Sequence, residues 1–176
     1  MKIIAIFAIC LLLLGVGCNK TTTVVNTPAA GEGPEVAQLK ASDNHLKQAK
    51  KFYSEGKYRQ AQQHCEKAIN FNHRNWEAHY YLGLTSQKRD EYYSSIKVFN
   101  SGLKYAPDNK FIKSEIHLAM GISWEKLGNL DKAENEFRMA LAFNPENNSA
   151  RQGKNRVKIE KTIKDWGKDV RHKHDG

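Results

Sequence analysis

The chain has 176 residues, 40% of them hydrophobic and 27% charged, which is ordinary for one modest globular domain. Its formal net charge of +9 suggests a nucleic-acid partner, but no nucleic-acid-binding motif is present and we expect no such partner. The positive excess is concentrated after residue 150. A solvated helix face explains this excess better than contact with anionic lipid or with an acidic protein.

Residues 1–17 have the pattern of a secretory signal. Lys2 gives a positive start, Ile3–Leu14 is an apolar run too short for an ordinary transmembrane helix, and small residues then lead to Cys18. The segment resembles a bacterial lipoprotein signal, which implies that Cys18 is lipidated and becomes the mature amino terminus. Asn19 resembles the second residue of lipoproteins sent to the outer membrane. We therefore expect an exported, lipid-anchored protein of the bacterial envelope that faces the periplasm. A plain secretory signal cleaved without lipidation is the alternative.

Residues 18–41 separate the signal from the first periodic segment. They lack apolar periodicity and contain turn formers such as Thr27-Pro28 and Gly33-Pro34. We therefore expect a flexible tether, and about two dozen residues of such a chain reach ~25–30 Å. That reach holds a domain just off a membrane surface.

Residues 42–147 repeat one pattern three times, in units 42–75, 76–109 and 114–147, with an insert at 110–113. A fixed period of 34 residues is typical of a solenoid, in which each unit is too small to bury its own apolar face. Small residues recur at the eighth, twentieth and twenty-seventh places of the units: Ala49, Ala61 and Ala68, then Gly83, Ser95 and Gly102, then Gly121, Ala133 and Ala140.

Each unit is predicted to form two helices joined by a turn. Its apolar and small residues fall three, four or seven places apart, as on one face of a helix. Gly56, Asp90 and Gly128 mark the turn, where glycine adopts a left-handed backbone at no steric cost. Pro107 and Pro145 close the second and third units, because proline lacks the donor that continues a helix. The small residues predict close approach of the helix backbones.

This array resembles the tetratricopeptide repeat (TPR) family over residues 42–145. The family's small and aromatic places are met nearly throughout the second and third units. The first unit departs from the pattern at Gln48 and lacks the closing proline. The resemblance implies an all-α, right-handed α-solenoid of three helix pairs, whose inner groove holds a peptide or a helix of another protein.

A further helix is expected at 148–171, followed by a disordered tail at 172–176. Three repeats are close to the minimum for a stable stack, so this helix is predicted to cap the array. Basic residues surround an apolar stripe whose members are spaced by four, three and four places: Ile159, Ile163, Trp166 and Val170. The alternative is a basic amphipathic helix that lies on an anionic membrane.

The resemblance to the TPR family also implies which residues line the groove. These are mainly the fifth and ninth places of each first helix and their neighbours: Leu46, Lys50, Tyr53, Tyr80, Tyr81, Leu84, Leu118, Ile122 and Glu125. The set of cations that grips a partner's terminal carboxylate in some relatives is absent, because only Lys50 is basic at the matching places. We expect an exposed apolar stripe that binds an apolar segment, helical or extended, of another envelope protein. The alternative is that the chain's own tether or cap helix fills the groove.

Neither cysteine nor histidine usage indicates catalysis, and we expect no enzyme, no metal site and no cofactor. Once the signal is removed and Cys18 lipidated, Cys65 is the one free thiol, at a place predicted to face the core. His45, His79 and His117 occupy the same place of successive units. Stacked helices about 10 Å apart prevent three imidazoles so placed from sharing one metal, so we predict packing roles for them.

The lipid anchor, the tether and the repeat array together resemble assembly lipoproteins of bacterial envelopes. Similar in kind are the pilotins that help the secretin rings of type IV pili to assemble. The predicted function is to bind an apolar segment of a partner and assist assembly of an envelope complex. Alternatives are a scaffold that recruits a cell-wall enzyme, or a periplasmic adaptor without lipid. The oligomeric state is left open.

Overall fold

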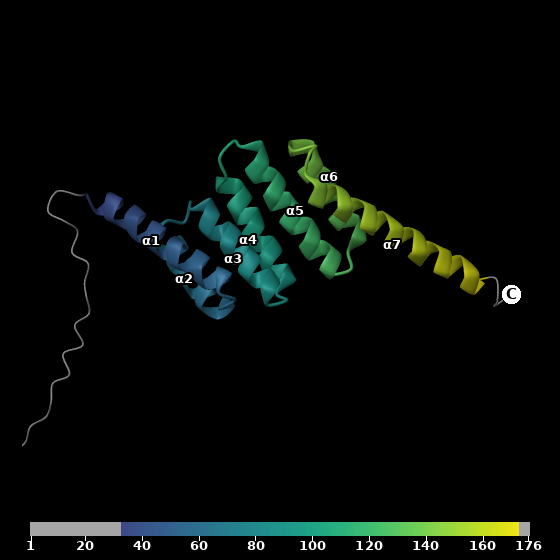
Figure 1. The fold of residues 1–176 in the computed structure, drawn as a ribbon, viewed down its shortest axis with the longest axis horizontal. Helices are drawn as coiled ribbons and strands as arrows, with labels where there is room; N and C mark the ends of the chain where they lie inside the picture. Colours follow the sequence, from purple (N-terminus) through teal and green to yellow (C-terminus); the bar gives the residue numbers. More distant parts are fainter. Residues whose placement is uncertain (1–32, 173–176) are drawn as a thin grey trace, which may run out of the picture.

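The computed structural model describes residues 33–172, with side chains described as far as Trp166. Within this range the chain forms seven α-helices and no strand: α1 (Pro34–Ser54), α2 (Tyr58–Phe71), α3 (Trp76–Lys88), α4 (Tyr92–Tyr105), α5 (Lys110–Lys126), α6 (Leu130–Phe143) and α7 (Asn148–His172). The helices stack in chain order (Figure 1), which confirms the predicted all-α class. The signal segment, Cys18 and the first part of the predicted tether lie outside the described residues.

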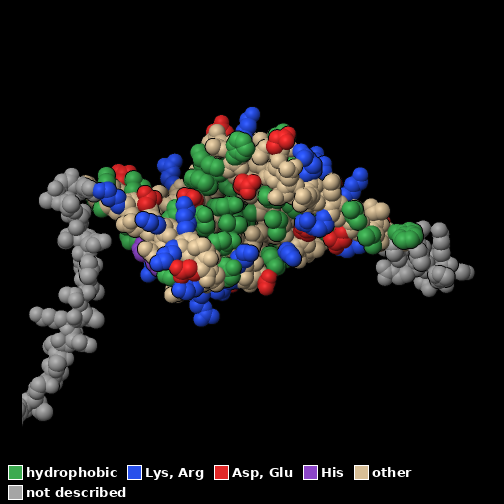
Figure 2. All heavy atoms as spheres, viewed as in Figure 1, with side chains coloured by type: hydrophobic (Ala, Val, Ile, Leu, Met, Phe, Trp, Pro, Cys, Tyr) green, Lys and Arg blue, Asp and Glu red, His purple; other side chains and the backbone are tan. Residues whose placement is uncertain are grey.

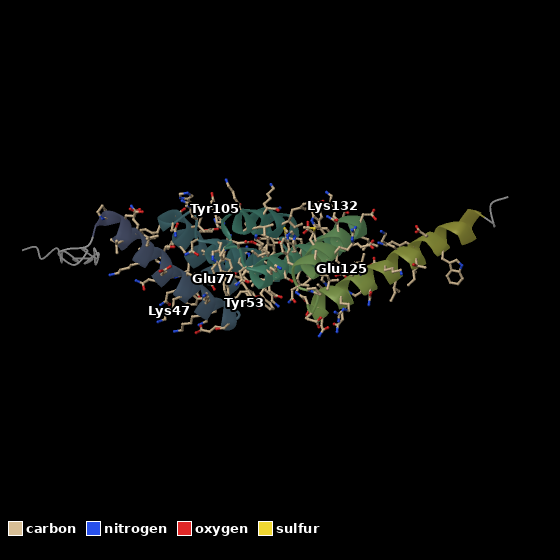
Figure 3. All side chains as sticks on the ribbon, turned by 90° about the horizontal axis from the view of Figure 1, so that it is seen from above. Lys47, Tyr53, Glu77, Tyr105, Glu125 and Lys132 are labelled. Carbon is tan, nitrogen blue, oxygen red and sulfur yellow. The ribbon has the colours of Figure 1, made fainter. Side chains whose placement is uncertain are left out.

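The seven helices form two layers. Helix α1 packs against α2, α3 against α4, and α5 against α6, so each predicted unit is one helix pair. The odd-numbered helices also contact one another in succession from α1 to α7. Figure 3 separates the layers: Tyr53, Glu77 and Glu125 of the odd-numbered helices lie on one side, and Tyr105 and Lys132 of the even-numbered helices lie on the other.

A left-handed residue follows the first helix of every unit, as the sequence predicted for Gly56 and Gly128. Gly56 has a φ of 73° and Gly128 a φ of 74°. Asp90 takes the same conformation with a φ of 61°, although it carries a side chain. Its carboxylate accepts a hydrogen bond of 2.6 Å from the hydroxyl of Tyr92, and aspartate tolerates this backbone region better than most residues.

Close contacts between the two helices of a pair depend on glycine opposite phenylalanine. A Cβ atom at Gly83 would lie 2.4 Å from the ring of Phe99, and one at Gly121 would lie 2.6 Å from the ring of Phe137. Both rings are fully buried. The small residues therefore make room for a ring, beyond the general close approach that the sequence predicted.

The first unit uses a different pair of residues at these places. Ala49 stands where the other units have glycine, and Cys65 stands where they have phenylalanine. Both side chains are fully buried. The methyl group of Ala49 and the small thiol of Cys65 therefore stand buried where the other units have a glycine and a ring.

In the first and third units, a set of hydrogen bonds that the sequence did not reveal joins the unit to the helix that follows it. We call this set the polar relay. The Ser42 hydroxyl donates to the carbonyl of Ala68, and the Asn75 amide donates to the Ser42 oxygen, both at 2.9 Å. The Asn75 side-chain oxygen then caps α3 by accepting from the Ala78 amide at 3.0 Å. The third unit repeats the relay into α7 through Ser114, Ala140, Asn147 and Ala150.

Two predicted boundaries were wrong. Helix α1 begins at Pro34, so residues 34–41 belong to this helix rather than to a flexible tether. Proline suits the first turn, and Glu35 lies near the positive end of the helix dipole. The insert 110–113 is the first turn of α5, which begins where the side chain of Asn109 accepts hydrogen bonds from two backbone amides.

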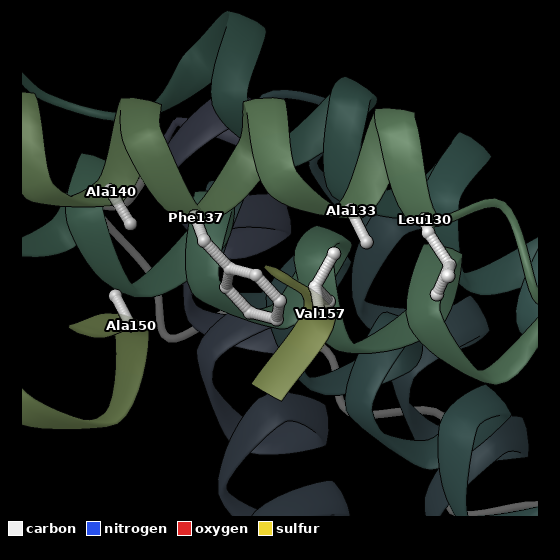
Figure 4. Packing of buried hydrophobic residues seen from close by; sticks show 6 residues of the cluster. All are labelled: Leu130, Ala133, Phe137, Ala140, Ala150 and Val157. Carbon is white, nitrogen blue, oxygen red and sulfur yellow. The ribbon is translucent and has the colours of Figure 1, made fainter. Parts of the chain in front are cut away.

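Helix α7 occupies the place predicted for the capping helix, but it packs with a different face. Its buried residues are Ala150, Gly153 and Val157, which lie against α6 around the ring of Phe137 (Figure 4). The predicted apolar stripe faces solvent, with Ile159 60%, Ile163 61% and Trp166 72% exposed. The face with small residues packs against α6 because there is no room for a larger side chain: a Cβ atom at Gly153 would already lie 2.6 Å from Phe137. Ile159 follows Val157 by two residues, about 200° around the helix.

Candidate partner-binding groove

The predicted groove residues all lie in the layer of odd-numbered helices. Helix α1 supplies Leu46, Lys50 and Tyr53, α3 supplies Tyr80, Tyr81 and Leu84, and α5 supplies Leu118, Ile122 and Glu125. Figure 2 shows hydrophobic side chains gathered over the middle of the array, with a carboxylate side chain among them. The structure therefore brings the predicted residues to one layer, which we call the inner face.

The inner face is less exposed than the sequence predicted. Leu46 is only 6% exposed, so it belongs to the core and is not available to a partner. Tyr80 and Leu84 pack against the cluster around Phe99, and Ile122 packs against the cluster around Phe137. The expected exposed stripe is therefore half-buried, because neighbouring odd-numbered helices contact one another and their apolar side chains fill the seams.

Lys50 and Glu125, the two charged residues among the predicted groove residues, are already paired within the chain. Lys50 of α1 lies 2.6 Å from Glu77 of α3, and its ammonium group is 5.3 Å from the centre of the Tyr81 ring. Arg156 of α7 donates to Glu125 of α5 at 2.7 Å. Each pair bridges two odd-numbered helices. Because the pairs are partly exposed, we attribute to them orientation of the helices and only ~0–1 kcal/mol of stability each.

Edge-to-face tyrosine contacts run from α1 into α3. The Tyr53 ring lies 5.8 Å from that of Tyr81 at 85°, and the Tyr81 ring lies 5.9 Å from that of Tyr80 at 85°. The Tyr80 ring then lies 5.9 Å from that of Phe99. These geometries are favoured for aromatic pairs, so the row fixes the tyrosines in place before any partner arrives.

A pocket of about 210 Å³ opens between α3 and α5 on the inner face. It is lined by Trp76, Glu77, Tyr80, Tyr81, Phe111, Ile112, Glu115 and Ile116. Phe111 is 69% exposed and comes from the insert before the third unit. Sequence reasoning did not predict that Trp76 and Phe111 line a pocket. The insert was the available signal, since it places an extra aromatic residue at the start of α5.

The pKa of Tyr80 is raised to about 12, mainly by burial and to a smaller extent by the nearby carboxylate of Glu115 and the other tyrosines. The hydroxyl is therefore neutral and available as a donor at physiological pH. Burial also raises the pKa of Tyr53, with Tyr58 and Tyr81 as smaller causes. The tyrosines of the inner face thus offer apolar rings and neutral hydroxyl groups.

The thiol and the repeated histidines lie away from the pocket. Burial raises the pKa of Cys65 to about 12, so the thiol is protonated and unreactive at neutral pH. His45 contacts His64, His79 contacts the carbonyl of His73, and His117 contacts Glu136. Within residues 33–172, no group of three His, Cys, Asp or Glu side chains is placed to hold a metal ion. None of the helices in this range is sufficiently long and apolar to span a bilayer.

No protein-family model and no curated protein matches the chain. Solved structures do match. The TPR domain of Arabidopsis OM64 has a TM-score of 0.65 at 19% identity, over 70% of this chain and 98% of that one. The second TPR domain of human RPAP3, in complex with an HSP70 peptide, has a TM-score of 0.61 at 20% identity, over 70% of this chain and 98% of that one. The Yersinia enterocolitica type III secretion chaperone SycD, in complex with a peptide of the translocator YopD, has a TM-score of 0.61 at 17% identity. This match covers 68% of this chain and 93% of SycD.

These similarities show that the chain has the TPR fold. They agree with the stacked helix pairs of this chain.

Proposed function

We propose that the chain is a protein–protein interaction module that holds a segment of a partner against its inner face. The observation on which this depends is the pocket between α3 and α5, which combines an apolar lining with an exposed aromatic side chain, Phe111. Exposed aromatic residues around a pocket are typical anchors of protein interfaces. The RPAP3 and SycD structures are complexes with peptides, which supports a peptide-binding use of this fold.

We further propose that the module works in the bacterial envelope, anchored to the membrane through lipid on Cys18. The support is the lipoprotein-like pattern of residues 1–18. The partner would then be another envelope protein, and the role would be to assist assembly of an envelope complex such as a pilus secretin. We propose no catalytic role, and we expect no turnover of cell-wall substrates by the purified chain.

Substitution of Phe111 tests the binding role. Phe111→Ser removes the most exposed ring of the pocket and should leave the fold intact, since its side chain is 69% exposed. The matched control is Tyr93→Ser on α4, where the ring is 65% exposed and lies outside the pocket lining. Tyr80 and Leu84 are unsuitable for this purpose, because both pack against the core around Phe99.

The measurement is capture of partners from a detergent-solubilised envelope by the full-length chain, with the captured proteins identified by mass spectrometry. We expect Phe111→Ser to lose a partner that Tyr93→Ser retains. Equal capture by both variants would show that the pocket is not the binding site. A secretin or barrel protein among the partners would support an assembly role, whereas a cell-wall hydrolase would support the alternative of a scaffold.

Lipidation is tested separately by metabolic labelling with a fatty acid. The wild-type chain should incorporate the label and fractionate with membranes, and Cys18→Ser should do neither. A labelled Cys18→Ser chain would disprove the proposed anchor.

A further inference from the structure

We propose that the pocket between α3 and α5 binds a lysine or arginine side chain, so that the partner segment is basic as well as apolar. This inference rests on the proposed binding function and adds the chemistry of the partner. It depends on three features of the pocket: its aromatic lining residues, a carboxylate without a cationic partner, and a cation of the chain that already binds one side of the lining.

Aromatic residues make up half of the pocket lining. Trp76, Tyr80 and Tyr81 come from α3, and Phe111 comes from the first turn of α5. The faces of aromatic rings attract cations, and tryptophan does so most strongly. The aliphatic stem of a lysine or arginine also packs well on such walls while its charged head stays near solvent. An apolar side chain would fit the walls equally well, so the rings alone do not select a cation.

The carboxylate of Glu115 is what favours a cationic side chain over an apolar one. Glu115 lies in the pocket lining and is exposed to solvent. One of its oxygens accepts a hydrogen bond of 3.0 Å from the Asn147 amide, which orients the carboxylate without neutralising it. Within the described part of the chain, no basic side chain pairs with it. The second carboxylate of the lining, Glu77, is neutralised by Lys50. The pocket therefore holds one net negative charge, in a chain whose formal charge is +9.

Lys50 shows within the chain how a cation binds on this face. Its ammonium group forms an ion pair with Glu77 at 2.6 Å and lies 5.3 Å from the centre of the Tyr81 ring. Tyr81 and Glu77 also line the pocket, so Lys50 binds one side of its lining. Glu115, on the α5 side of the lining, has no such cation from the described residues, and this side is left for a cation of the partner.

An acidic segment does not fit this pocket. In the peptide SGPTIEEVD of the RPAP3 complex, three of the last four residues are acidic. Here the one inner-face lysine at the predicted groove positions is held by Glu77, and Glu115 would repel a second carboxylate. The preferred segment therefore carries Lys or Arg among apolar residues.

Selection from a library of random dodecapeptides tests the inference, with the full-length chain held in lipid nanodiscs. The wild-type chain should enrich peptides in which Lys or Arg stands beside apolar residues, and SGPTIEEVD should not compete with them. Glu115→Lys should lose the basic preference. The matched control Glu66→Lys, which reverses an exposed carboxylate on α2, should keep it. Binding of a selected peptide should weaken about tenfold in Glu115→Gln, the loss typical of a hydrogen bond to a charged group.

The outcomes separate the inference from the proposed function. Enrichment of apolar peptides without a basic preference, or unchanged binding to Glu115→Gln, overturns the inference and leaves the binding role standing. Enrichment of acidic peptides overturns it in the same way. No enrichment of any peptide by the wild-type chain overturns both.

Discussion

Gly83→Ala should destabilise the fold even though alanine is the better helix former. The new Cβ atom would lie 2.4, 2.6 and 2.8 Å from three carbon atoms of the Phe99 ring. Carbon atoms in contact normally lie about 3.5–4.0 Å apart, so the ring would have to move by about 1 Å. Phe99 is fully buried and packs against Ile116 and Met120 of α5. Its ring therefore has no free space to enter.

Two opposing contributions set the expected magnitude. Overpacking a well-filled core costs about 1–3 kcal/mol. Replacing glycine by alanine inside a helix stabilises by about 0.8–1 kcal/mol. Because three contacts fall below 3.0 Å, we expect overpacking near the upper end of its range. The free energy of unfolding should then fall by about 2 kcal/mol.

Urea denaturation followed by circular dichroism measures this change. Gly102→Ala is the comparison, because its nearest contacts are His79 Cβ and the Trp76 carbonyl at 3.3 Å, so the neighbouring atoms would have to move by much less than the Phe99 ring. It should therefore destabilise the fold less than Gly83→Ala does. In a double-mutant cycle, Phe99→Leu should cost less in the Gly83→Ala chain than alone, since the smaller side chain relieves the clash. If Gly83→Ala matches or exceeds the wild type in stability, the ring does not lie against Gly83 as described.

Further substitutions probe the cap helix, the relay and the pH response. Val157→Ala should lower the free energy of unfolding by about 2 kcal/mol, whereas Ile163→Ala should change it by under ~0.5 kcal/mol; the opposite ranking in urea denaturation would restore the originally predicted packing face. Asn147→Ala should cost about 2 kcal/mol by the same assay, because it removes the α7 cap and a buried hydrogen bond, and a loss below ~0.5 kcal/mol would contradict the relay. Burial lowers the pKa of both His45 and His64 from 6.5 in the folded chain, so the unfolded chain binds more protons and stability should fall as pH drops below 6.5. Denaturation at a series of pH values should show that His64→Gln weakens this dependence, and an unchanged slope would rule out the histidine pair as its source.

The sequence by itself determined the helix pairs of the array and the turn within each pair. Its period, its small residues and its turn residues are local properties, and they act through backbone conformation and helix-face spacing. Gly56 and Gly128 have the predicted left-handed backbone for this reason.

Only the tertiary structure decided which faces are covered. The stripe of Ile159, Ile163 and Trp166 has helical spacing, but spacing does not say which neighbour a face meets. Val157 and the small residues before it lie against α6 instead, because only they approach the Phe137 ring closely enough. The pocket is likewise a product of assembly, since its walls come from helices of two different units and its depth depends on how those helices stack.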